Sequence, residues 1–223
     1  MEFTTVQGDI ARQSADALVN AAGTSLKMGS GVAGALRRAA GGPINEEAVS
    51  KGPVDLGAAA VTDAYDLDAD HVIHAAAMPH YGDGRATRES IAAATTNALE
   101  AADDLGCESV VLPVLGTGAA GFEFAEGARI VCEAIDEYDP ETVSDVRVIA
   151  YSDEEFETLQ RVADEVRGGA SLLVSPPDCS LPGFASRPPC STPGSVERAP
   201  PGRPRSPPRT SRRRRWSGGR WSR

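Results

Sequence analysis

The chain has 223 residues, of which 41% are hydrophobic, and its formal net charge at pH 7 is −10. This length and apolar content suffice for the core of one ordinary domain, and they exclude a wholly disordered protein. Because the chain has no apolar run of about 18 residues and its N-terminus lacks the basic start of a secretory signal, we expect a soluble, cytoplasmic protein that has no contact with a membrane.

The charge is divided unevenly along the chain. Residues 1–167 carry 30 acidic and 11 basic side chains, whereas residues 168–223 carry 11 arginines and only 2 acids. An acidic, lysine-poor domain of this kind is typical of halophiles, in which surface carboxylates keep proteins hydrated and soluble. The same acidity argues against binding of nucleic acid by residues 1–167 through general attraction to phosphates.

Strand and helix patterns alternate along residues 1–167. Apolar runs predict strands at residues 3–6, 17–22, 59–62, 71–75, 109–115 and 146–151, and helical spacing predicts helices at 32–39, 87–105, 123–138 and 153–166. This alternation indicates an α/β layered domain. In such domains ligands bind at the loops that follow the carboxyl ends of strands.

Residues 168–223 lack this periodicity. They contain 11 of the 16 prolines and both tryptophans, and such a composition cannot bury enough surface to offset the entropy of ordering. We therefore expect one folded domain over residues 1–167 and a disordered tail over residues 168–223. The arginines and tryptophans of the tail suit a nucleic-acid-binding arm. The abrupt change of composition is also what out-of-frame translation of a GC-rich gene yields, and we favour that interpretation.

The four cysteines, at positions 107, 132, 179 and 190, form no CxxC pair and have no histidines at metal-ligand spacing. The pattern indicates neither a zinc site nor a disulfide framework, so reduced thiols are expected. The sequence predicts no bound metal and no cofactor.

Two glycine-rich loops each stand between a predicted strand and a predicted helix, at residues 29–31 and 116–121. Glycines let backbone N–H groups approach a phosphate, and a helix N-terminus favours its negative charge. The second loop fits G-x-G-x-x-G, but it comes late in the chain, and the acids about 20 residues further on fall inside a predicted helix. Alone it predicts phosphate binding and a plain tight turn about equally. Two such loops together suggest a diphosphate.

Three other polar residues are candidates for chemistry. Asp9 follows the first predicted strand, where it is either a helix N-cap or turn residue, or the acceptor for the amino group of a base. His74 lies in a predicted central strand and is expected to be a buried, hydrogen-bonded residue. His80 lies in a loop with Asp83, and the two would suit general base catalysis, but ordinary turn chemistry is the favoured explanation of this loop.

Five segments in this order resemble the macro domain, an ADP-ribose-binding module: GDI (8–10), DALVNAA (16–22), GSGVA (29–33), VIH (72–74) and PVLGTGAAGF (113–122). The resemblance covers residues 1–167. It implies a three-layer α/β/α fold with a central mixed sheet. It also implies a cleft that holds ADP-ribose or ADP-ribosylated molecules.

The resemblance further implies which residues contact the ligand. Asp9 would bind the adenine amino group, Ile10 would line the adenine pocket, and Tyr151 would stack on the base. Asn20 is expected in the same site. The other expected contacts come from the two glycine loops: Gly29, Ser30, Gly31 and Val32 beside the diphosphate and distal ribose, and Thr117, Gly118, Ala119, Ala120, Gly121 and Phe122 around the phosphates.

The sequence departs from the hydrolytic members of that family at two positions. They usually have an asparagine where this chain has Gly23, and the best-known deacylating group has an aspartate where this chain has Ala33. Ala120 also stands where members of the family frequently have an aromatic residue beside the distal ribose. Because the two missing polar side chains would position or activate water near the distal ribose, the resemblance implies ADP-ribose binding with at most slow hydrolysis of adducts. The alternatives are an active ADP-ribosyl hydrolase or O-acetyl-ADP-ribose deacetylase and, more weakly, nucleic-acid binding through the tail.

Overall fold

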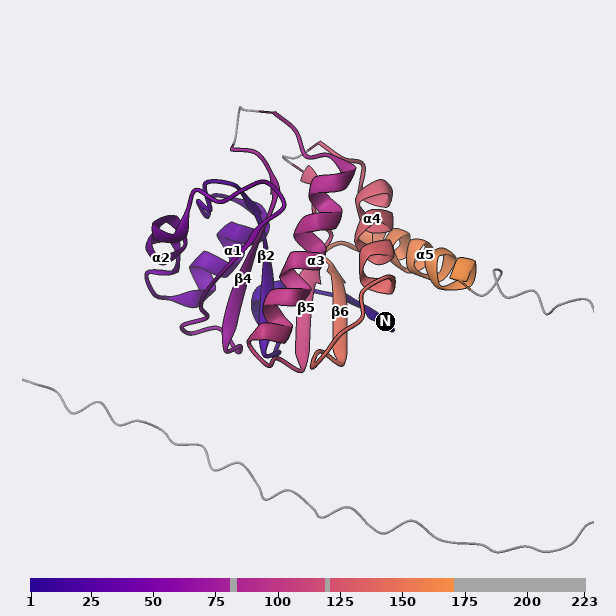
Figure 1. Cartoon of the computed structure of the whole chain (residues 1–223), viewed down its shortest axis with the longest axis horizontal. Coiled ribbons are helices and arrows are strands. Elements are labelled where there is room, and N and C mark those ends of the chain that lie inside the picture. Colours follow the sequence, from indigo (N-terminus) through magenta and orange to yellow (C-terminus); the bar gives the residue numbers. More distant parts are fainter. Residues whose placement is uncertain (81–83, 119–120, 171–223) are drawn as a thin grey trace, which may run out of the picture. The chain divides into compact units, whose positions relative to one another are not determined.

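The computed structural model describes residues 1–80, 84–118 and 121–170 (Figure 1). The tail predicted over residues 168–223 lies outside this part of the chain, except for its first residues, which continue the last helix to Ala170.

One six-stranded sheet forms the centre of the described part, in the order β1-β6-β5-β2-β4-β3. Its strands are β1 (Thr4–Gln7), β2 (Ala17–Gly23), β3 (Ala59–Asp63), β4 (His71–Met78), β5 (Ser109–Pro113) and β6 (Asp145–Ala150). Every neighbouring pair is parallel except β3 with β4. The predicted strands and the predicted mixed sheet are therefore confirmed.

The helices are η1 (Ile10–Arg12), α1 (Gly31–Ala40), α2 (Ile44–Lys51), α3 (Arg88–Asp104), α4 (Phe124–Asp136) and α5 (Asp153–Ala170). All four predicted helices are present. The sequence did not predict η1 and α2, because η1 is a single 3-10 turn and α2 buries only Ile44 and Ala48. Two apolar positions are too few to set a helical pattern apart from a loop.

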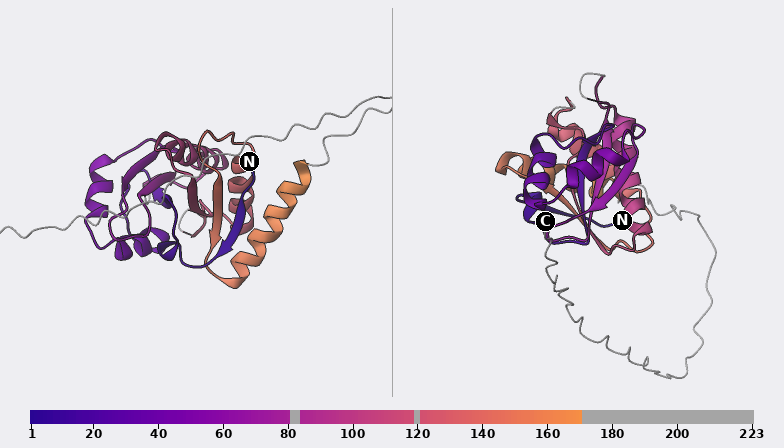
Figure 2. Two further views of the ribbon diagram at one scale, coloured as in Figure 1. Left: turned by 90° about the horizontal axis from the view of Figure 1, so that it is seen from below. Right: turned by 90° about the vertical axis from the view of Figure 1, so that its left-hand side faces the viewer.

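Helices cover both faces of the sheet, which confirms the predicted three-layer architecture. Successive side chains of a strand point to opposite faces. Val19 accordingly belongs to the apolar cluster that includes residues of α3, α4 and α5, whereas its neighbour Leu18 belongs to the cluster that includes Leu36 of α1 and Ile44 of α2. Figure 1 shows α3 crossing in front of β5, and Figure 2 shows α5 alongside β1.

The parallel strands place their carboxyl ends at one edge of the sheet. The segments that leave this edge are η1 after β1, residues 24–30 after β2, residues 114–123 after β5, and Tyr151 after β6. Both glycine-rich loops thus lie at the edge where the sequence predicted a ligand site.

Membrane-spanning helices, metal sites and cysteines concern the described chain as a whole and not only this edge of the sheet. Within the described ranges, no helix combines the length and apolar character needed to cross a bilayer. The same residues hold no group of three side chains that could bind a metal ion. Cys107 and Cys132 are buried free thiols, and Cys179 and Cys190 lie outside the described residues.

Asp103, at the end of α3, fixes the segment that leads into β6. Its carboxylate accepts hydrogen bonds from Tyr138 Oη (2.5 Å) and from the backbone N–H groups of Glu141 (3.1 Å), Thr142 (2.8 Å) and Val143 (2.8 Å). Partial burial opposes ionisation, but these donors outweigh it and hold the pKa of Asp103 well below its usual value. The ionised carboxylate is therefore part of the folded structure.

We predict that Asp103→Asn lowers the free energy of unfolding at pH 7 by about 1–3 kcal/mol, because an amide cannot accept all of these hydrogen bonds. Because the pKa of Asp103 is lower in the folded than in the unfolded state, its ionised carboxylate stabilises the fold above the unfolded-state pKa of about 3.9. This stabilisation is lost as the pH falls from that value through the folded-state pKa. Denaturant titrations should therefore show the gap between wild type and variant closing in acid. Asp104→Asn, an exposed neighbour with the same charge change, is the control; equal losses in both variants would contradict the role of Asp103.

Candidate functional site

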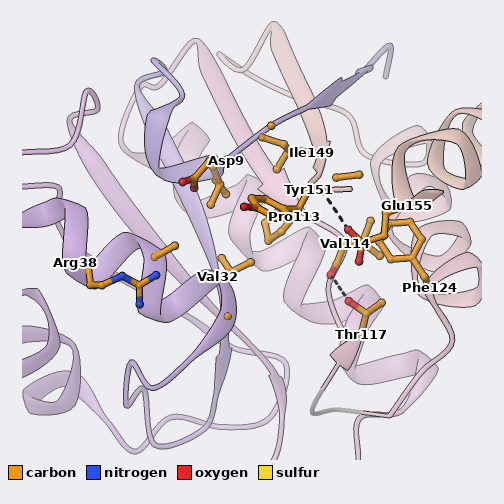
Figure 3. Close-up of a pocket in the computed structure, with 15 residues that line it drawn as sticks. Asp9, Val32, Arg38, Pro113, Val114, Thr117, Phe124, Ile149, Tyr151 and Glu155 are labelled. Carbon is orange, nitrogen blue, oxygen red and sulfur yellow. Dashed lines mark hydrogen bonds between the residues drawn. The ribbon is translucent and has the colours of Figure 1, made fainter. Parts of the chain in front are cut away.

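A cavity of about 380 Å³ opens at the carboxyl edge of the sheet, between α1 and the ends of β1, β5 and β6 (Figure 3). Six of the predicted site residues line it: Asp9, Ile10, Gly31, Val32, Thr117 and Tyr151. Its other lining residues are Gly8, Ala35, Arg38, Pro113, Val114, Phe124, Ile149, Ala150 and Glu155. The volume lies in the range typical of pockets for small molecules.

Asp9 has two roles in this structure. Its Oδ1 accepts a hydrogen bond from the N–H of Ala11 (3.0 Å), so the side chain is the N-cap of η1. The same residue lines the cavity beside Ile10. The N-cap that the sequence offered as one alternative is confirmed, whereas the role as acceptor for a base stays a prediction. The Oδ2 atom of Asp9 has no hydrogen-bond partner among the described residues.

The first glycine loop delivers the N-terminus of α1 to the cavity. Gly31 has a left-handed φ of +59°, which favours glycine, and together with Val32 it lines the cavity. Ser30 is the N-cap of α1, but its side chain makes no capping hydrogen bond, so it is available to a ligand. Gly29 and Ser30 are exposed and do not line the cavity. Gly34 lets α1 lie close to this loop, since a Cβ there would be 2.8 Å from the oxygen of Gly29.

The second glycine loop is held in a tight turn after β5. Gly116, Gly118 and Gly121 all have left-handed φ angles, of +82°, +68° and +87°. The N–H of Phe122 donates to the oxygen of Gly116 (3.1 Å), and that of Gly121 donates to the oxygen of Gly118 (3.1 Å). From this loop only Thr117 lines the cavity, and Ala119 and Ala120 lie outside the described residues.

Tyr151 extends from the end of β6 at the rim of the cavity, with 76% of its surface exposed. Its backbone N–H donates to Glu155 Oε2 (3.2 Å), as does that of Ser152 (3.3 Å), which ties the start of α5 to the cavity (Figure 3). An aromatic side chain that stays exposed beside an apolar cavity offers a free face for a planar ligand.

The charges of the cavity are few. Asp9 and Glu155 are its acidic residues and Arg38 is the one basic residue among those that line it. Arg38 makes no hydrogen bond or ion pair with any described residue, and Figure 3 shows it on α1, well apart from Thr117. The remaining lining is largely backbone and apolar side chains.

Asn20 does not line the cavity. It is 1% exposed in β2, and its Nδ2 donates to His74 Nδ1 (3.0 Å), while His74 Nε2 lies 3.0 Å from Thr62 Oγ1. Burial lowers the pKa of His74 to about 4, so the imidazole is neutral at pH 7. The expectation of a buried, hydrogen-bonded His74 is confirmed. Asn20 belongs to this polar layer between β2, β4 and β3.

Of the residues considered for catalysis, those that the structure describes do not line the cavity. His80 is exposed and does not line it, and Asp83 lies outside the described residues. Gly23 ends β2, where a Cβ would lie 3.1 Å from the oxygen of Pro79. Ala33 is 7% exposed and packs with apolar neighbours of α1.

Sequence reasoning missed several lining residues. Ala35 and Arg38 follow Val32 at intervals of three along α1, so helical spacing alone places them on the cavity side. Phe124 and Glu155 stand near the starts of α4 and α5 and reach the cavity because those helices begin at the same edge of the sheet. The assembled site has a hydrogen-bond acceptor at Asp9, apolar walls, and glycine-rich backbone at Thr117. This combination suits a planar base joined to a phosphate group.

Comparison with known proteins agrees with this architecture. The Macro domain family model matches residues 19–131, and the chain belongs to the macro domain family. An uncharacterized protein of Sulfolobus acidocaldarius is 38% identical over 169 residues, which cover 74% of this chain and 91% of that relative. A macro domain-containing protein of Caldanaerobacter subterraneus is 32% identical over 166 residues, covering 72% of this chain and 95% of the relative.

The chain also matches part of a longer relative. An uncharacterized protein of Mycobacterium tuberculosis is 39% identical over 153 residues, which are 69% of this chain but only 42% of that protein. The chain thus spans about two fifths of the length of this relative.

Solved structures show the same fold. The Oceanobacillus iheyensis macrodomain with ADP superposes with a TM-score of 0.66 at 24% identity, covering 74% of this chain and 91% of the other. The Trypanosoma brucei macrodomain in complex with ADP gives a TM-score of 0.62 at 23% identity, covering 71% and 67%.

We predict that Gly116→Ala destabilises the glycine loop after β5. Alanine at position 116 would have to adopt a left-handed φ, and its Cβ would lie 2.2 Å from Ile91 Cδ1. Backbone strain and overpacking would therefore both lower the free energy of unfolding. Gly118→Ala is the control, because Gly118 has a similar φ with no atom within 4 Å of its Cβ position. Thermal unfolding should show a loss of about 1–2 kcal/mol for Gly118→Ala and a larger one for Gly116→Ala. Equal losses would rule out close packing on Ile91.

Proposed function

We propose that this chain binds ADP-ribose and ADP-ribosyl derivatives in the cavity at the carboxyl edge of the sheet. The observation that carries the proposal is the joining of Asp9, an apolar slot and the glycine loop after β5 in one cavity. The Oceanobacillus iheyensis macrodomain has been solved with ADP and, as a variant, with ADPR, which supports the same class of ligand for this chain.

In this proposal the adenine lies between α1 and β6. Asp9 accepts a hydrogen bond from the adenine amino group, Val32 and Ile149 contact the base, and Tyr151 stacks on it. The diphosphate lies along Gly31 and Thr117, where the start of α1 and the glycine loop offer backbone N–H groups. Gly29, Ser30, Gly118, Gly121 and Phe122 remain proposed contacts toward the distal ribose, and Asn20 supports the strand beneath.

We further propose that the chain binds without rapid turnover. Hydrolysis at the distal ribose needs a water molecule that is positioned and activated, and neither Gly23 nor Ala33 carries a polar side chain for that task. An asparagine at position 23 would crowd the oxygen of Pro79, and an aspartate at position 33 would bury a carboxylate among apolar residues. The local packing thus agrees with the loss of both groups, and slow hydrolysis of ADP-ribosyl adducts is the most that we propose.

The remaining proposals concern the whole chain. The macro domain is proposed to comprise residues 1–167, in a cytoplasmic protein whose acidic surface is adapted to high salt, as the excess of 30 acids over 11 bases favours. Nucleic-acid binding is proposed only through the arginine-rich tail, most of which lies outside the described residues.

Asp9→Asn tests the proposed adenine contact. Asparagine caps a helix as well as aspartate does, so the melting temperature should stay close to that of wild type. The affinity for ADP-ribose, measured by calorimetry, should fall by about 1–3 kcal/mol, because the charge-assisted bond to the amino group is lost. In wild type, ADP-ribose should bind with micromolar affinity, and AMP and ribose 5-phosphate much more weakly.

Two results would contradict that assignment. Equal affinity of wild type and Asp9→Asn would remove Asp9 from the site. A matched loss of affinity and melting temperature would show that the carboxylate acts only as the cap of η1, and Asp9→Ala, which lacks any cap, gives the size of that structural effect.

We predict that turnover of O-acetyl-ADP-ribose and of ADP-ribosylated protein is slower than the roughly 1 per second of a typical enzyme, while ADP-ribose binding is intact. Loss of one positioned group that orients or activates water removes about 10²–10⁴-fold in rate, and both such positions are apolar here. Product release followed by chromatography measures this rate. Turnover at typical enzyme rates would reject the proposal, and His80→Ala would then show whether the exposed histidine supplies the base.

A further inference from the structure

Arg85 lies in the loop after β4 and rests against the glycine loop after β5. A Cβ built on Gly121 would lie 3.7 Å from Arg85 Cδ and 3.9 Å from its Nε. Gly121 has a left-handed φ of +87° and presents only backbone at this point. The aliphatic stem and Nε of Arg85 therefore lie beside Gly121, at the end of the loop that is proposed to hold the phosphates. Neither Arg85 nor Gly121 lines the cavity itself, so this contact lies next to the cavity, on the side of Gly121.

The loop after β4 also contacts the end of β2. A Cβ on Gly23 would lie 3.1 Å from the oxygen of Pro79, and one on Gly84 would lie 3.5 Å from Pro79 Cγ. Pro79, before residues 81–83, thus lies beside Gly23, and Arg85, after them, lies beside Gly121. Figure 1 shows the chain on either side of residues 81–83 at the same end of the fold as the loop between β5 and α4.

The guanidinium group of Arg85 has no partner among the described residues. It is exposed and makes no hydrogen bond or ion pair within them. Five other arginines of the domain are paired with carboxylates: Arg88 with Glu133, Arg129 and Arg161 with Glu165, Arg147 with Asp145, and Arg167 with Asp164. Arg12, Arg37 and Arg38, like Arg85, have no carboxylate partner among the described residues, but of these four only Arg85 lies beside Gly121. In a domain with so many acids, a cation that is left unpaired beside a glycine loop is open to an anion from outside the chain.

The residues that line the cavity carry little positive charge, so a further cation nearby would favour the binding of an anionic ligand. A diphosphate brings negative charge to a cavity whose acidic residues are Asp9 and Glu155 and whose lining includes only Arg38 as a base. Arg38 stands on α1, apart from the glycine loop. Backbone N–H groups alone would therefore face both the ligand charge and the surrounding carboxylates.

We propose that Arg85 pairs with the phosphate charge of the ligand at the glycine loop after β5. A planar guanidinium donates two parallel hydrogen bonds to phosphate oxygens and binds them more strongly than a neutral donor does. The inference rests on the proposed function, since it assigns a positioning residue to the same site. It adds that this chain selects ligands by their phosphates through a side chain from the loop after β4.

Titrations with adenosine, ADP and ADP-ribose test this role in the full chain. Arg85→Gln should lower the affinity for ADP and for ADP-ribose about tenfold and leave the affinity for adenosine unchanged. A loss of about tenfold corresponds to the lower end of the range for a hydrogen bond to a charged group, as suits an exposed position. Arg85→Lys should recover part of the loss. The affinity of wild type for ADP should fall more steeply with added salt than that of Arg85→Gln. Arg88→Gln, which removes the same charge three positions along and is paired with Glu133 on α4, should match wild type.

Each other result decides against the proposal. Unchanged ADP affinity in Arg85→Gln overturns it, and a loss for ADP-ribose alone assigns Arg85 to the distal ribose and overturns the pairing with phosphate. An equal loss in Arg88→Gln shows a general effect of net charge and also overturns it. Wild type that binds neither ADP nor ADP-ribose overturns the proposed function itself, and melting temperatures confirm that all variants are folded.

Discussion

Parallel strand pairing is the constraint on which the rest of this structure depends. Because β1, β6, β5, β2 and β4 run in one direction, the segments that leave them meet at a single edge. Asp9, Val32, Thr117 and Tyr151 are far apart in the sequence, yet all line one cavity there. No single segment is a binding site. The sheet supplies the geometry, and short loops supply the polar groups.

The sequence predicted what depends on local pattern. Strands, four helices and both glycine loops follow from apolar spacing and from residues that permit left-handed backbone, and Asp9 is recognisable from its place after the first strand. The sequence could not predict which side chains from different helices and strands contact one another. Asn20 stands in a segment that resembles the family, but whether its side chain meets a ligand or His74 depends on which face of β2 it occupies and on what packs there. Glu155 joins the site only because α5 starts beside Tyr151.

The acidity of the domain and its proposed anionic ligand are in tension. Carboxylates around a cavity disfavour a diphosphate. Three features of the described residues would counter this effect: glycines with left-handed φ that let the backbone approach a ligand, the start of α1, and Arg38 and Arg85, which form no ion pair among these residues. The scarcity of polar side chains around the cavity is also the basis of the proposal that the chain binds its ligand without rapid turnover. Backbone groups hold phosphates well, but they cannot take up a proton as a side chain does.

The double role of Asp9 has a consequence for how tightly a ligand is held. Oδ1 is engaged by the N–H of Ala11, so the side chain is already confined to one rotamer in the free protein, and Oδ2 is left for a ligand. An unconstrained aspartate would lose rotational freedom on binding, at a cost of roughly 0.5–1.5 kcal/mol for an immobilised side chain. Here that entropy is lost during folding. In the proposed complex the 3-10 turn would therefore preorganise Asp9 for its contact with the base.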